Sequence, residues 1–122
     1  MLQGNFFTIT SIHAEINSAK AVLEINPAHE IFNGHFPVTP VVPGVCMIQM
    51  VKEIMEDILA RETRMIKAEH IKFLNVINPE QTSSVHLDLK FTISDNKHAN
   101  VVASLFNDEV VYFKFKGALK PV

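Results

Sequence analysis

Residues 44–62 read GVCMIQMVKEIMEDILARE, and this stretch decides the fold. Its apolar residues recur three or four positions apart, at Ile48, Val51, Met55 and Ile58. That spacing is typical of one face of an α-helix. The first half of the stretch is more apolar than a surface helix needs, so we expect the helix to begin buried. The sequence therefore predicts one central helix over residues 44–62.

The segments on both sides of this helix have the composition of β-strands. They are rich in β-branched and aromatic residues, or alternate apolar with polar residues, as strands do. These segments are residues 6–12, 19–25, 71–74, 85–93, 101–106 and 110–115. The pair Asn107-Asp108 predicts a two-residue hairpin loop of the primed type. About six strands, largely antiparallel, and one long helix predict an α+β fold in a single domain over residues 1–122.

The composition excludes several classes of protein. The 122 residues include 11 Lys and Arg against 13 Asp and Glu, a net charge of −2, which argues against binding to nucleic acid through bulk charge. A single cysteine, Cys46, excludes an intrachain disulfide framework and fits a reducing compartment. We find neither the pattern of a secretion signal nor an apolar run long enough to span a membrane. The expectation is a cytoplasmic protein.

An ordered loop precedes the helix. Residues 31–43 read IFNGHFPVTPVVP, in which three prolines and a glycine rule out a long helix or a central strand. The loop delivers His35, a side chain able to act as a general base near neutral pH. The N–H groups at the helix start, around Gly44, Val45 and Cys46, could bind a carbonyl oxygen that gains negative charge. Gly44 has no side chain to block the approach of a ligand.

The segment FNGHFP at residues 32–37, followed by Pro40 and by PGV at residues 43–45, resembles the 3-hydroxyacyl-[acyl-carrier-protein] dehydratases, the FabZ/FabA-like enzymes of the hotdog fold. The similarity continues over KFLNVINPEQ at residues 72–81 and covers roughly residues 21–89. The family fold is a curved antiparallel sheet wrapped around one long helix, which agrees with the strands and helix predicted above. The resemblance also implies a dimer with two active sites at its interface.

The resemblance implies roles for individual residues. By position, His35 matches the histidine that removes the C2 proton of a 3-hydroxyacyl thioester. Gly44 matches the glycine whose amide polarises the thioester carbonyl, and Phe36, Pro43 and Val45 are the expected neighbours of the bound substrate. The substrate would be carried on the phosphopantetheine of an acyl carrier protein or on CoA, with no metal and no other cofactor.

The family's helix carboxylate, which handles the C3 hydroxyl, is replaced in this chain. It falls five residues after the Pro-Gly glycine, and that residue is Gln49. A carboxamide does not exchange a proton near pH 7, although it can hydrogen-bond and orient a hydroxyl. The family commonly carries a glutamine four residues later, where this chain has Glu53. The acid and the amide are therefore exchanged between two positions on one helix face, about 5.4 Å apart.

Three functions follow from this arrangement. The first is reversible dehydration of a 3-hydroxyacyl thioester to a 2-enoyl thioester, with His35 as base and Gln49 or Glu53 completing the catalytic site. The second is a catalytically impaired binding subunit, or the weaker partner in a heterodimer of two hotdog subunits. The third is an acyl thioesterase that uses Glu53 to activate water. The chain starts without the longer N-terminal region of the housekeeping enzymes, which favours a specialised pathway such as polyene or polyketide synthesis.

The remaining candidates have simpler interpretations. Cys46 is expected to be a small buried hydrophobe rather than a nucleophile. The methionines of the helix are expected to fill the core or to line an acyl channel. The other histidines lack the spacing of metal ligands. These histidines are His13, His29, His70, His86 and His98.

Three cations follow the predicted helix. Arg61, Arg64 and Lys67 would suit a solvated helix end, where positive charge complements the helix dipole. The alternative is that they meet the acidic surface of an acyl carrier protein or the phosphate of its phosphopantetheine.

Overall fold

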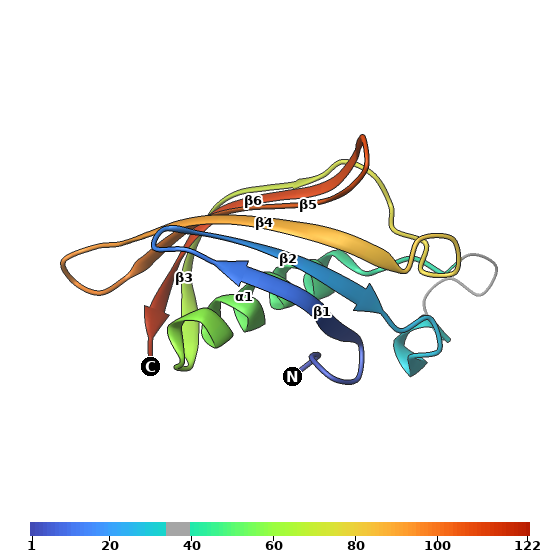
Figure 1. The fold of residues 1–122 in the computed structure, drawn as a ribbon, viewed down its shortest axis with the longest axis horizontal. Coiled ribbons are helices and arrows are strands. Elements are labelled where there is room, and N and C mark those ends of the chain that lie inside the picture. The colour runs from blue at the N-terminus through green and yellow to red at the C-terminus, as the bar shows by residue number, and fades with distance from the viewer. Residues whose placement is uncertain (34–39) are drawn as a thin grey trace.

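A computed structural model describes residues 1–33 and 40–122 of the chain. Its elements are β1 (Phe7–Ala14), β2 (Ser18–Ile25), the short 3₁₀-helix η1 (Glu30–Phe32), α1 (Gly44–Leu59), β3 (Thr63–Phe73), β4 (Ser84–Ile93), β5 (Ala99–Asn107) and β6 (Val110–Pro121). The strands form one antiparallel sheet in the order β1-β2-β4-β5-β6-β3. Helix α1 lies along one face of this curved sheet (Figure 1). This is the predicted α+β hotdog fold.

The core lies between the sheet and α1. In β4 every second residue is buried, and the buried ones are Val85, Leu87, Leu89 and Phe91. The face of α1 that packs against them includes Met47, Met50, Val51, Ile54 and Met55. The prediction of a central, buried helix is therefore confirmed, and the helix methionines are core residues. Among the described residues, no helix is long and apolar enough to cross a membrane.

Helix α1 ends earlier than the sequence predicted. It stops at Leu59, and Ala60 adopts a left-handed backbone conformation with φ 57° and ψ 38°. The N–H of Ala60 donates to the carbonyl of Glu56, which caps the last turn. The chain then enters β3 at Thr63, so the predicted end of the helix at residue 62 was wrong by three residues.

Strand β3 is the element that the sequence reading mostly missed. Only residues 71–74 were predicted as strand, whereas β3 runs over Thr63–Phe73 at the edge of the sheet. Its pairing with β6 is interrupted by irregularities between Met65 and Lys67 and between Ala68 and His70. Nearly all of its residues are exposed or half-buried. Two breaks in the register and exposure on both faces remove the period-two pattern by which strands are recognised.

The position of β3 corrects the interpretation of the three cations. Arg64 and Lys67 lie on β3 and not at a helix end. Arg61 follows the helix, and its Nη2 donates to the carbonyl of Val122 at 3.2 Å. These three side chains therefore do not form one cluster at the end of α1.

The hairpin between β5 and β6 is shifted by one residue from its predicted place. The loop consists of Asp108 and Glu109, not Asn107 and Asp108. Asp108 has φ 50°, a left-handed value that aspartate tolerates. Asn107 ends β5, and its side chain donates to the carbonyl of Ser84 at 2.8 Å.

Candidate active site

The predicted site is centred on the start of α1. Two of its predicted residues, His35 and Phe36, lie outside the described residues. Pro43 forms the N-cap of α1, with extended backbone angles, and its carbonyl accepts from the N–H of Cys46 at 3.0 Å. Within residues 1–33 and 40–122, the N–H groups of Gly44 and Val45 find no acceptor. Two main-chain donors at the positive end of the helix are thus available to a ligand.

An apolar surface adjoins these two donors. A Cβ atom built on Gly44 would lie 2.7 Å from Cζ of Phe73, so the ring is packed directly against the glycine. The ring of Phe73 also stacks on that of Phe113, with centroids 5.3 Å apart. Val45 is 72% exposed and Phe73 53% exposed, and Leu74 and Val76 are exposed beyond them. We call Val45, Phe73, Leu74 and Val76 the helix-start patch.

The segment that carries the helix-start patch is tied to the protein at several points. The N–H of Val42 donates to the carbonyl of Ile77 at 2.9 Å, which holds the entry to α1 beside the chain that follows β3. The N–H of Leu74 donates to the carbonyl of Tyr112 at 2.9 Å. The patch is therefore an ordered apolar surface, of the kind that binds acyl groups or another protein.

Gln49 and Glu53 are in direct contact on the same helix. Nε2 of Gln49 donates to Oε2 of Glu53 at 2.9 Å. The same oxygen accepts from the N–H of Leu2 at 2.7 Å, and Oε1 of Glu53 accepts from the N–H of Gln3 at 2.8 Å. Glu53 is only 3% exposed. Its carboxylate thus has three donors, two of them from the main chain at the N-terminus.

The Gln49 side chain lines a depression between α1 and the N-terminal residues. The depression has a volume of about 570 Å³ and is also lined by Met1, Gln3 and Lys52. Nζ of Lys52 binds Oε2 of Glu56 at 3.1 Å rather than the carboxylate of Glu53. The carboxylate of Glu53 is therefore stabilised by amide groups, since no salt bridge to it is found among the described residues.

Two titratable groups near the site have shifted pKa values. Burial raises the pKa of Glu56, but a hydrogen bond from the N–H of Thr63 at 2.7 Å and the ammonium of Lys52 outweigh it, so the pKa lies below its ordinary value. Burial raises the pKa of the Cys46 thiol. Cys46 is a buried neighbour of the core, which confirms its interpretation as a small hydrophobe.

Three of the five described histidines have local structural partners for their side chains. Nδ1 of His29 accepts from the N–H of Ile31 at 3.0 Å and caps η1, while His86 stacks on Phe106. His13 lies 3.4 Å from the carboxylate of Glu15. Over residues 1–33 and 40–122, no three His, Cys, Asp or Glu side chains gather in the way that a metal ion needs.

Sequence reasoning missed two contributors to this region. One is the main chain of Leu2 and Gln3, which binds a carboxylate about 50 residues away in the sequence. Backbone N–H donors are present in almost every residue, so no residue type marked them. The other is Phe73, which packs on Gly44 from a strand whose pattern was obscured.

Comparisons with known proteins agree with the fold. The family model described as ApeI-like, ApeI dehydratase, matches residues 11–105. The 3-hydroxyacyl-[acyl-carrier-protein] dehydratase FabZ of Rickettsia canadensis is 30% identical over 98 residues, which cover 71% of this chain and 65% of that protein. FabZ of Rickettsia felis is 27% identical over 92 residues, covering 69% of this chain and 60% of the relative. The chain therefore spans less than two thirds of the length of these relatives.

Solved structures share the fold over nearly the whole chain. A chain of the dehydratase heterocomplex ApeI:P from Xenorhabdus doucetiae superimposes with a TM-score of 0.72 at 26% identity, covering 92% of this chain and 96% of that one. A protein from Erwinia carotovora subsp. atroseptica, with a TM-score of 0.68 at 22% identity over 93% of this chain and 95% of that one, shares the fold. This chain belongs to the ApeI-like dehydratase family.

Proposed function

We propose that this protein catalyses the reversible dehydration of a 3-hydroxyacyl thioester to a 2-enoyl thioester. The observation that carries the proposal is that the N–H groups of Gly44 and Val45 find no acceptor within residues 1–33 and 40–122 and adjoin the apolar helix-start patch. Amide donors at a helix start stabilise the negative charge that a thioester carbonyl gains when the C2 proton is removed. Other reactions of acyl thioesters also place negative charge on the thioester carbonyl oxygen. Membership of a dehydratase family supports dehydration over those reactions.

The proposed chemistry uses the histidine of the FNGHFP motif as base. His35 takes the C2 proton, and the electrons of that C–H bond form an enolate whose oxygen accepts from the N–H of Gly44. The enolate then collapses to the C2–C3 double bond and expels the C3 oxygen. The proton that His35 took goes to this oxygen, so that water leaves and the base is restored. Gln49 accepts a hydrogen bond from the C3 hydroxyl and orients it.

We propose that two subunits complete each site. Gly44 and Gln49 are five residues apart, which places them about 140° apart around the helix axis. A single acyl group bound at Gly44 would therefore meet the Gln49 of a second subunit more readily than that of its own chain. Each subunit is one hotdog domain over residues 1–122. The pairing subunit is a second copy or another hotdog chain, as the name of the ApeI:P heterocomplex suggests for its own members.

The exposed edge of β3 is the proposed pairing surface. This strand ends the sheet, and Ile66, Ile71 and Phe73 are exposed along it. An edge strand offers a row of main-chain donors and acceptors to a second strand. The apolar side chains on it would be buried by that pairing.

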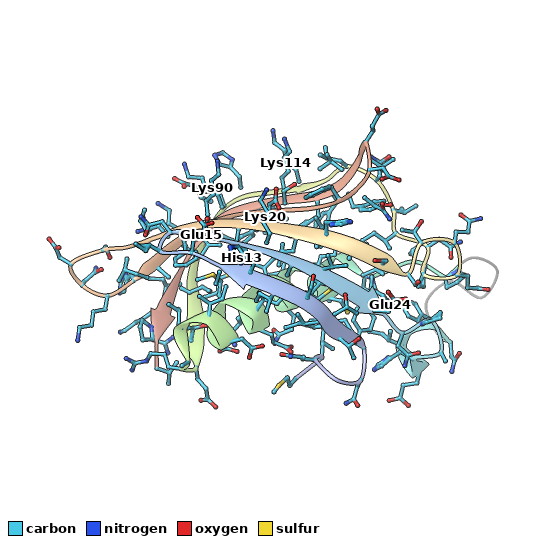
Figure 2. The ribbon with its side chains drawn as sticks, viewed as in Figure 1. His13, Glu15, Lys20, Glu24, Lys90 and Lys114 are labelled. Atoms are coloured by element: carbon cyan, nitrogen blue, oxygen red, sulfur yellow. The ribbon has the colours of Figure 1, made fainter. Side chains whose placement is uncertain are left out.

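We propose an acyl carrier protein as the donor of the substrate, because the outer face of the sheet is rich in lysine. Among the lysines of this face, Lys20, Lys90 and Lys114 are seen to project away from α1 (Figure 2). Lys67, Lys72 and Lys116 line the hollows of this face, and Nζ of Lys67 and of Lys116 lie 3.7 Å and 3.6 Å from the carboxylate of Glu69. Lys72 and Lys114 are direct partners in the register of β3 and β6.

Like charges opposite one another on a sheet are unfavourable, and an acidic partner would offset that repulsion. Two hollows of about 930 Å³ and 460 Å³ lie on this same face, lined by Lys90 and Lys116 in the first and by Lys72 and Lys114 in the second. CoA, the alternative carrier, would not require so wide a cationic surface. The match to the ApeI-like dehydratase family supports polyene or polyketide-like acyl chains as the proposed substrates.

One observation favours a second function, that of an impaired subunit in a heterodimer. The carboxylate of Glu53 is already bound by three donors, and Gln49 cannot deliver a proton. A chain of this kind could bind the substrate while a partner subunit supplies the acid. The same occupied carboxylate disfavours a thioesterase, which needs a carboxylate free to activate water.

The test is the loss of water from a 3-hydroxyacyl group on a carrier protein, followed by mass spectrometry. We expect turnover by the wild type, a loss of at least a hundredfold in His35→Ala, and no such loss in the matched loop-neighbour variant Asn33→Ala. If the wild type shows no loss of water and Gln49→Glu restores dehydration, the impaired-subunit function replaces the proposal. If thioester hydrolysis is the only reaction, the dehydratase assignment is wrong.

A further inference from the structure

A chain of hydrogen bonds joins the N-terminus of the protein to Gln49 through Glu53. The Leu2 and Gln3 amides donate to the two carboxylate oxygens, and the Gln49 amide donates to one of them. None of these donors carries a charge, and Glu53 is almost completely buried. A carboxylate held in this way is a fixed acceptor with a defined orientation.

This arrangement fixes the polarity of the Gln49 side chain. A carboxylate only accepts hydrogen bonds, so the NH₂ group of Gln49 must face Glu53 and its Oε1 must face away. The terminal torsion of a glutamine is otherwise broad, and the amide could present either its donor or its acceptor end. With Glu53 in place, Gln49 presents an acceptor to whatever binds beside it.

The N-terminal segment is held firmly enough to do this. The N–H of Phe6 donates to the carbonyl of Leu2 at 2.8 Å, and that of Gly4 donates to the carbonyl of Phe7 at 2.7 Å. Gly4 has φ 93°, a backbone angle that residues other than glycine rarely adopt. Phe6 and Phe7 are fully buried in the core. The turn of residues 2–7 therefore aims the Leu2 and Gln3 amides at Glu53.

We propose that Glu53 is a positioning residue that, with the main chain of Leu2 and Gln3, fixes Gln49 as an acceptor and so selects acyl thioesters bearing a hydroxyl at C3 over those bearing a carbonyl. This inference rests on the proposed function, because it takes the ligand to be an acyl thioester. A C3 hydroxyl can donate a hydrogen bond to Oε1 of Gln49. A C3 carbonyl cannot, because its oxygen and Oε1 of Gln49 are both acceptors. Sites built around one such hydrogen bond reject analogues that cannot form it.

The test compares two ligands in the assembled protein. Non-hydrolysable thioether analogues of a 3-hydroxyacyl and of a 3-oxoacyl pantetheine are titrated by calorimetry into the wild type, Glu53→Gln and Glu56→Gln. We expect the wild type to prefer the hydroxy analogue at least tenfold. Glu53→Gln frees both amides to rotate, and we expect its preference to fall below threefold. Glu56→Gln removes one charge from the same helix without touching Gln49, and should keep the wild-type preference.

A second pair of variants covers the case in which Glu53→Gln does not fold. Gln3→Pro removes one main-chain donor to Glu53 and should lower the preference, while Gln3→Ala keeps the donor and should not. Equal weakening of both ligands in Glu53→Gln and Gln3→Pro, with their ratio unchanged, would give Glu53 a purely structural role and overturn the inference. If the wild type binds neither analogue, that result contradicts the proposed function itself, and with it the inference that rests on it.

Discussion

A methyl group added at Gly117 should destabilise the protein far more than one added at Gly44. A Cβ atom on Gly117 would lie 2.3 Å from the backbone carbonyl oxygen of Lys67 and 2.6 Å from the ring of Phe115. On Gly44 it would lie 2.7 Å and 2.8 Å from atoms at the tip of the Phe73 ring. A half-exposed ring can turn aside, whereas a carbonyl in a paired strand moves only if β3 moves away from β6.

The two sites therefore differ in the free energy of unfolding that is lost. Overpacking costs about 1–3 kcal/mol in general. The backbone clash puts Gly117→Ala at the upper end, about 3 kcal/mol, and the movable ring puts Gly44→Ala below about 1 kcal/mol. For a chain of 122 residues, each kcal/mol lowers Tm by about 4 °C. We expect a fall of about 12 °C for Gly117→Ala and of less than about 4 °C for Gly44→Ala.

Urea unfolding followed by circular dichroism, together with thermal melts, measures both differences. The slope of the free energy with urea should be unchanged, so that the loss is read from the midpoint. Size-exclusion chromatography of Gly117→Ala should also show a weakening of the proposed subunit pairing, because β3 is displaced. Equal losses at the two glycines, or a larger loss at Gly44, would refute the argument that clashes with paired backbone cost more than clashes with a side-chain tip.

Three further predictions follow from the burial and charge of single residues. Cys46 should not react with a thiol reagent in the native protein at pH 8, because it is buried and its pKa is raised, and it should react at once in urea; rapid native labelling would contradict this. The folded pKa of Glu56 is lowered, so its contribution to stability is present above the ordinary value of 4.5 and is lost as the pH falls through the lowered value. The urea midpoint of the wild type should therefore fall more steeply below pH 4.5 than that of Glu56→Gln, and parallel curves would disprove the assignment. Lys114→Glu should raise the KM for a carrier-borne substrate about tenfold at low salt, as electrostatic docking predicts, and leave the KM for the pantetheine substrate unchanged. Lys97→Glu, an exposed charge change in the loop between β4 and β5, should alter neither KM. An equal effect of the two variants would contradict docking of the carrier on the outer face of the sheet.

Regular burial made most of the fold readable from the sequence. The strands later found as β4 and β5 have one buried face, so apolar and polar residues alternate along them. Helix α1 has one buried face and shows the helical period. Strand β3 lies at an edge and carries two irregularities, so its sequence shows neither the alternation of a strand nor the spacing of a helix. The end of α1 was also missed, because Ala60 takes a left-handed conformation without the glycine that usually marks such an end.

The candidate site was predictable only where side chains carry its chemistry. The loop motif and the spacing from Gly44 to Gln49 were visible in the sequence, and so was the exchange of acid and amide between Gln49 and Glu53. The partners of Glu53 were not visible, because they are main-chain groups of Leu2 and Gln3 brought up by the turn at Gly4. Contacts of that kind depend on the path of the chain and are independent of the residue types that make them.

The unshared edge of β3 has a consequence for how such proteins diversify. Within the described residues β3 pairs only with β6, and its other side offers main-chain groups that any hotdog chain of similar curvature can match. With subunit pairing through this edge as proposed, the product of a duplicated gene would retain the capacity to assemble with that of its parent from the start. Discrimination between like and unlike subunits must then evolve in the side chains that flank the edge, such as Ile66 and Ile71. With two subunits completing each site as proposed, one copy could lose an acid while the assembly keeps working, so an amide at position 49 would be an accessible evolutionary step.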